Sequence, residues 1–138
     1  MRSFLLMLSL CGHQAWADLK FSDAIIYIPL KGSSVTAGYA VIENETKEAV
    51  TLTLQSVAGF KAVEVHQTLE KDGRAAMQKV ENFVVAPKSR LVLKPGGNHM
   101  MLFDPLREFK PAEEINAIFI VNEKSQTVKM KIVARPTQ

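Results

Sequence analysis

Two histidines and two methionines are the residues of this sequence best suited to chemistry. They are His66, Met77, His99 and Met101. Thioether sulfur is a soft, uncharged donor and imidazole is a borderline one, so together they suit Cu(I) and poorly suit Mg²⁺ or Ca²⁺, which prefer oxygen. Zinc usually takes cysteine, histidine or carboxylate ligands. The donor types therefore favour copper(I) as the bound ion.

The segment 99–103 predicts a strand that presents two of these donors on one face. His99 and Met101 are two residues apart, so in an extended strand their side chains point the same way. Met100 and Leu102 then point to the other side, into the core. A Gly-Gly loop directly before His99 lets the backbone turn sharply.

The segment 62–69 predicts a second strand with a polar face that includes His66. Alternation places Val63 and Val65 on one side and His66 on the other. An Asp72-Gly73 pair between two extended runs is a hairpin signal. Such a hairpin would return Met77 beside His66.

The rest of the chain shows period-two alternation in short runs that are separated by turn residues, and no apolar stripe at helical spacing. This pattern predicts an antiparallel β-sandwich or barrel. Besides the two strands above, we expect strands at 24–30, 35–43, 50–55, 76–80, 83–85, 90–93, 115–121 and 127–133, the last two forming a final hairpin around 122–126.

The N-terminal segment predicts export from the cytoplasm. Arg2, an apolar run over 4–10 and Ala15-Trp16-Ala17 form a signal peptide of residues 1–17. The expected mature chain, residues 18–138, is a single domain. The sole cysteine, Cys11, lies in the signal peptide, so the mature chain has no disulfide and no thiolate.

Several classes of protein are excluded or disfavoured by what the mature sequence lacks. A blue-copper electron-transfer site requires a cysteine thiolate. The sequence has no G-x-S-x-G motif and no obvious acid–base pair around either histidine, so an enzyme is disfavoured. The net charge is +3, and the lysines are dispersed without a basic run, so nucleic-acid binding is not indicated.

The spacing H-x10-M-x21-H-x-M, formed by His66, Met77, His99 and Met101, resembles the signature of the PCuAC-type (DUF461) periplasmic copper chaperones. The segment 93–102, LKPGGNHMML, and the segment 63–66, VEVH, resemble that family too. The resemblance implies an all-β, cupredoxin-like antiparallel Greek-key β-sandwich. It also implies one Cu(I) ion near the surface, held by these four residues.

The resemblance further implies a monomeric periplasmic chaperone that passes Cu(I) to an acceptor, such as the copper centre of cytochrome c oxidase or another periplasmic chaperone. Two departures leave the partner open. Gln67 stands where many members have methionine, and the run 24–27 replaces a tryptophan and an arginine.

Alternatives remain for the protein and for its single residues. The chain could be a copper-buffering or structural β-sandwich without a dedicated acceptor. A lone His66 would be a surface histidine, and a lone Met77 or Met101 would be a core residue. Met130 alternates with lysines as a core residue would. Glu64 and Asp104 are either partners that orient a histidine or plain surface carboxylates.

Overall fold

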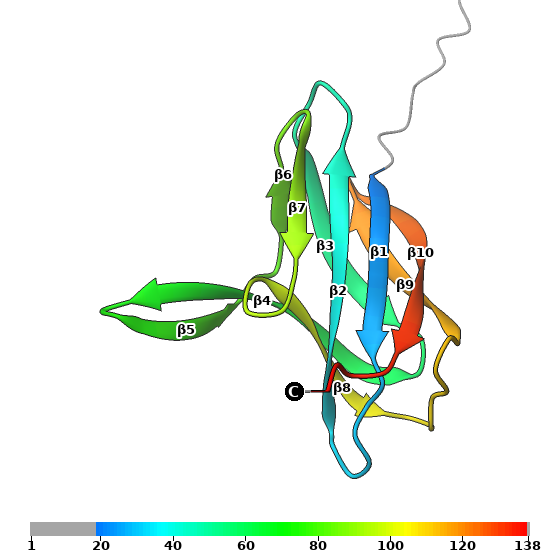
Figure 1. Cartoon of the computed structure of the whole chain (residues 1–138). Coiled ribbons are helices and arrows are strands. Elements are labelled where there is room, and N and C mark those ends of the chain that lie inside the picture. Colours follow the sequence, from blue (N-terminus) through cyan, green and yellow to red (C-terminus); the bar gives the residue numbers. More distant parts are fainter. Residues whose placement is uncertain (1–18, 138) are drawn as a thin grey trace, which may run out of the picture.

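The computed structural model describes residues 19–137. The regular elements in that range are all β-strands (Figure 1). No helix long and apolar enough to span a membrane occurs in this range. The predicted signal peptide lies outside the described residues. The strands are β1 (Lys20–Tyr27), β2 (Val35–Asn44), β3 (Val50–Val57), β4 (Phe60–Lys71), β5 (Arg74–Lys79), β6 (Phe83–Val85), β7 (Ser89–Leu93), β8 (His99–Pro105), β9 (Glu114–Val121) and β10 (Lys124–Val133).

The strands form a sandwich around one apolar core. Their hydrogen-bonded order is β5-β4-β8-β2-β1-β10-β9-β3-β6, with β7 pairing with β2. Figure 1 shows this sheet folded over, with β1 and β2 in front of β3 and β9. The core between the layers includes side chains from both, among them Ile26, Ile42, Met100, Leu102, Leu52, Phe119, Val121 and Met130. The predicted burial of Met100, Leu102 and Met130 is confirmed.

One strand pair departs from the purely antiparallel arrangement that the sequence predicted. β1 runs parallel to β10, with Ile26 opposite Ile132. Both residues are fully buried, so each strand must face the same core. Because nearly the whole chain separates the two strands, no tight turn forces them to run in opposite directions.

The first strand and the last hairpin also begin and end at positions other than those predicted. β1 ends at Tyr27, two residues before Pro29, which has no N–H to donate to a neighbouring strand. The last hairpin turns at Asn122 and Glu123, whose φ angles are 45° and 68°. Two positive φ values are typical of a two-residue hairpin turn, so β10 starts at Lys124.

Strand β2 pairs with two different strands on the same side, one after the other. Residues 35–38 pair with β8, and residues 40–44 pair with β7. The loop 94–98 connects β7 to β8 where the partner changes. It therefore delivers His99, the first residue of β8, at a fixed place beside the middle of β2.

Strands β4 and β5 form a hairpin arm, residues 66–79, that projects from the body (Figure 1). The predicted turn at Asp72 and Gly73 is confirmed, with φ values of 54° and 74°. Every residue of β5 is exposed. β5 is therefore held mainly by its pairing with β4, and one face of the arm continues the outer face of β4 and β8.

The alternation along β8 predicts that truncating its two adjacent methionines lowers stability by different amounts. Met100 is fully buried, so Met100→Ala should lower the free energy of unfolding by about 2–5 kcal/mol through lost burial and a residual cavity. Met101 is half-buried on the outer face, so Met101→Ala should cost much less. Urea unfolding of the metal-free variants measures both, and equal losses would contradict the assigned faces.

Candidate metal site

The two histidines lie directly opposite each other on neighbouring strands. His66 of β4 is in register with His99 of β8. Residues opposite each other in an antiparallel pair have side chains on the same face. The two ring centroids are 5.7 Å apart, with the ring planes inclined by 45°. The sequence predicted two strands that each present a histidine, and the pairing of β4 with β8 brings them together.

Met101 lies next to this pair on the same face. It follows His99 by two residues on β8 and is opposite Glu64 of β4. Its side chain is half-buried, whereas that of its neighbour Met100 points to the other side and is fully buried. His66, His99 and Met101 thus form a compact group of two imidazoles and one thioether on the outer face of the sandwich.

Met77 lies on the same face but farther out, on the hairpin arm. It is opposite Thr68, which is two residues from His66 on β4, so the predicted return of the chain is confirmed. Diagonal neighbours of this kind are roughly 7–8 Å apart, within reach of a long side chain. The Met77 side chain is 64% exposed. The four predicted residues therefore share a face, but only three of them are grouped together.

The loop before β8 fixes the position of the His99 ring. His99 Nδ1 lies 2.9 Å from the Gly97 carbonyl oxygen, which also accepts a hydrogen bond from the Thr68 hydroxyl at 3.0 Å. The loop is closed by the Lys94 amide, which donates to the Asn98 carbonyl. Gly96 has a φ of 79°, a conformation that residues with a side chain rarely adopt. The turn at Gly96 therefore helps to place the Gly97 carbonyl, which orients the His99 ring.

Glu64 orients the other histidine. Its Oε2 lies 2.7 Å from His66 Nε2, and its Oε1 lies 3.8 Å from Lys79 Nζ. The hydrogen bond with His66 lowers the pKa of Glu64, and the charge of Lys79 lowers it further. The pKa of Lys79 is raised, by Glu81 first and then by Glu64. An ionised carboxylate therefore faces the His66 ring at neutral pH.

Asp104, the other carboxylate that the sequence singled out, does not orient a histidine. It is exposed, and its backbone amide donates to the Ser34 carbonyl. Its side chain makes no hydrogen bond or ion pair with the described residues. The interpretation as a plain surface carboxylate therefore holds for Asp104 and not for Glu64.

The donor set fits a soft metal ion. Within residues 19–137, no group of three or more histidine, cysteine or acidic side chains could hold a metal, and the third donor beside the two imidazoles is the thioether of Met101. His66 Nδ1 is buried and has no hydrogen-bond partner among the described residues. A buried polar nitrogen without a partner is costly and uncommon. A metal ion bound to His66 through Nδ1 would give this nitrogen a partner.

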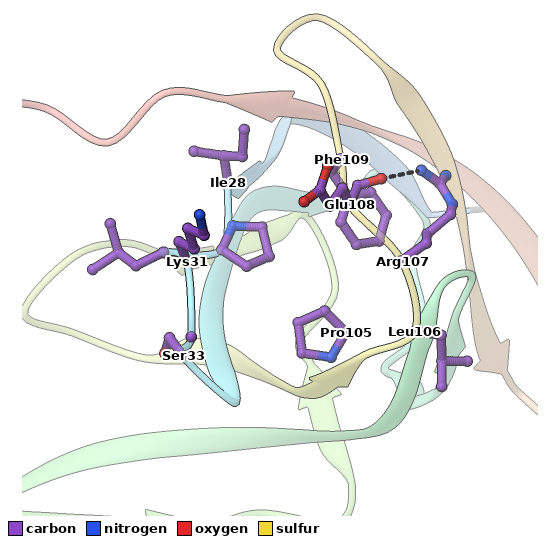
Figure 2. A pocket seen from close by; sticks show the side chains of 11 residues that line it. Ile28, Lys31, Ser33, Pro105, Leu106, Arg107, Glu108 and Phe109 are labelled. Carbon is purple, nitrogen blue, oxygen red and sulfur yellow. Dashed lines mark hydrogen bonds between the residues drawn. The ribbon is translucent and has the colours of Figure 1, made fainter.

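The hollow shown in Figure 2 lies at the opposite end of β8 and is a different kind of site. Its volume is about 520 Å³, and it lies between the β1–β2 loop and the segment 105–109. Pro105 is six residues beyond His99, which corresponds to about 20 Å along a strand. Its walls combine proline, leucine and the Arg107 side chain, which is stacked on Phe109. It contains none of the four predicted ligands.

Three solved structures share this fold. The apo PCuAC domain from PmoF1 is 19% identical, with a TM-score of 0.71, and the match covers 85% of this chain and 94% of that one. The copper-bound PCuAC domain from PmoF2 is 21% identical, with a TM-score of 0.66 and coverage of 85% and 93%. CuI-DR1885 from Deinococcus radiodurans is 20% identical, with a TM-score of 0.71 and coverage of 91% and 84%. These likenesses confirm the predicted PCuAC-type, cupredoxin-like fold.

Two curated relatives match part of the chain. RP573 of Rickettsia prowazekii, an uncharacterised protein, is 27% identical over 86 residues, which is 62% of this chain and 46% of that protein. Lxx21020 of Leifsonia xyli, named as a candidate lipoprotein, is 27% identical over 77 residues, or 55% and 46%. The matches thus span about half the length of these relatives. Residues 19–133 match the LpqE-like family of candidate lipoproteins, and the chain therefore belongs to the LpqE-like family.

Proposed function

We propose that this protein carries one Cu(I) ion, bound by His66, Met77, His99 and Met101, and passes it to an acceptor. The observation that carries the proposal is the pairing of His66 with His99, with the half-buried Met101 beside them on an outer face. Two imidazoles and a thioether form a soft, uncharged donor set that suits Cu(I). The copper bound in the PmoF2 domain and in CuI-DR1885, as their names state, supports the same cargo here.

The different settings of the two methionines suggest how the ion would be retained and released. Met101 is partly buried and already adjacent to both histidines, so it needs little ordering to bind. Met77 lies on the exposed arm, and its side chain must lose more rotamer freedom to reach the ion. Met77 is therefore the ligand that an incoming acceptor group would displace first.

The expected site of action is outside the cytoplasm, in the periplasm. The predicted signal peptide and the candidate-lipoprotein relatives support export. Exposed thiols there tend to be oxidised, whereas thioether and imidazole donors persist. An acceptor with thiolate ligands, such as a copper centre of cytochrome c oxidase, would draw Cu(I) from this neutral donor set. The role is therefore transport without catalysis.

An anaerobic Cu(I) titration against a chromogenic chelator tests the ligand set. The purified chain should bind one ion, and Met101→Ala should weaken binding by about tenfold or more, which is about 1.4 kcal/mol. Met77→Ala should weaken it less, because its side chain is less ordered beforehand. Met100→Leu is the matched control: it removes the adjacent sulfur, keeps the core volume and should leave the affinity unchanged. Unchanged affinity in both Met101→Ala and Met77→Ala would refute the assignment.

The kinetics of copper transfer distinguish a chaperone from a copper buffer. We expect the rate of Cu(I) transfer to a dicysteine peptide to rise with peptide concentration, because the acceptor attacks the exposed ion directly. Met77→Ala should accelerate transfer, since the acceptor then displaces one ligand fewer. A rate independent of peptide concentration would mean that release precedes capture, and buffering would then be the better description.

A further inference from the structure

Each histidine of the site already has one ring nitrogen engaged, and the two engaged nitrogens are different. His66 uses Nε2, which lies 2.7 Å from Glu64 Oε2. His99 uses Nδ1, which lies 2.9 Å from the Gly97 carbonyl oxygen. Since a neutral imidazole has one N–H and one lone pair, the position of the proton decides which nitrogen can bind a metal.

The acceptors fix the proton on each ring. A backbone carbonyl accepts and never donates, so His99 must carry its proton on Nδ1, which leaves the lone pair on Nε2. A carboxylate oxygen accepts hydrogen bonds, and Glu64 presents one 2.7 Å from His66 Nε2 while its other oxygen lies 3.8 Å from Lys79 Nζ. His66 therefore carries its proton on Nε2, and its lone pair is on Nδ1.

The surroundings of His66 Nδ1 support this assignment independently. This nitrogen is buried and has no hydrogen-bond partner among the described residues, although the His66 side chain as a whole is 17% exposed. A ring rotated by 180° would place a C–H group against Glu64 and lose the hydrogen bond. Glu64 therefore selects the orientation of the ring as well as its tautomer, and leaves the free lone pair on the buried Nδ1.

Glu64 also lies close to a charged side chain of the hairpin arm. Lys79 of β5 is opposite His66 in register and lies 3.8 Å from the second carboxylate oxygen. An exposed ion pair of this kind adds little stability. Lys79 thus lies beside one oxygen of Glu64 while the other oxygen is on His66. Glu81, 3.1 Å from the Lys79 ammonium group, makes no contact with either histidine.

We propose that Glu64 is a positioning residue that makes His66 bind Cu(I) through Nδ1, while the Gly97 carbonyl makes His99 bind through Nε2. The identity of the metal rests on the proposed function. The tautomers, however, are a property of the metal-free protein and can be measured without copper. A metal-ligating histidine whose other nitrogen donates to a carboxylate is oriented and made more basic by that carboxylate.

The test is a two-bond ¹H–¹⁵N correlation spectrum of the ¹⁵N-histidine-labelled chain, assigned with His66→Gln and His99→Gln. Metal-free His66 should be the Nε2–H tautomer and His99 the Nδ1–H tautomer. Added Cu(I), which is diamagnetic, should shift the ¹⁵N resonances of His66 Nδ1 and His99 Nε2. A metal-free His66 protonated on Nδ1, or a Cu(I) shift at His66 Nε2, would overturn the inference while leaving one-ion binding intact.

Three carboxylate variants separate positioning from a general structural role. Glu64→Ala should let His66 exchange between tautomers and should weaken Cu(I) binding by about 10- to 100-fold. Glu64→Gln keeps a hydrogen bond to Nε2, but its amide can accept or donate, so it should restore part of the affinity without fixing a single His66 tautomer. Glu81→Gln removes a nearby exposed carboxylate and should change neither the tautomer nor the affinity.

If Glu64→Ala keeps a single His66 tautomer and full affinity, Glu64 does not position the ring. If Cu(I) shifts neither histidine in the unmodified chain, the proposed function fails, and the assignment of the copper-binding nitrogens fails with it.

Discussion

The register between β4 and β8 is the constraint on which the metal site depends. Side chains alternate between the two faces of a strand, so a slip of one residue would exchange the outer and inner sets. The register that places His66 opposite His99 also places Val65 opposite Met100 and Val63 opposite Leu102. Burial of those apolar pairs therefore fixes the outer pairing. The core specifies the site, although no core residue belongs to it.

This arrangement lets the outer face bind a cation without weakening the fold. The three grouped donors carry no charge when the imidazoles are neutral, so their partial burial costs far less than that of carboxylates or thiolates would. The charge nearest to the site is that of Glu64, which remains accessible to solvent and close to Lys79. Metal binding then mainly affects polar atoms on the surface, and the apolar core does not need to rearrange.

The sequence predicted the local features of the site because they follow from short-range rules. Period-two alternation separated Met101 from Met100, and the Asp72-Gly73 pair fixed the hairpin that returns Met77. The pairing of β4 with β8 depends on residues more than thirty positions apart, and no local pattern encodes it. The parallel β1–β10 pair was missed for the same reason. The sequence offered both Glu64 and Asp104 as carboxylates that could orient a histidine, but it could not choose between them, and it did not indicate the contact of Gly97, because both depend on ring orientations set by tertiary contacts.

The position of Met77 connects the fold to the requirement for release. A carrier that enclosed its ion with four preorganised donors would bind it tightly but exchange it slowly. Here the three inner donors lie where β4 pairs with β8, at the base of the arm, and the fourth lies farther out on β5, which has no buried residue. The arm has few tertiary contacts that would resist its displacement, and such regions open at low free-energy cost. The ion would then become accessible from the side of the arm while the two histidines retain it. An acceptor approaching along β5 could therefore add its own ligand before the last histidine contact is broken, so Cu(I) need not pass free through solution.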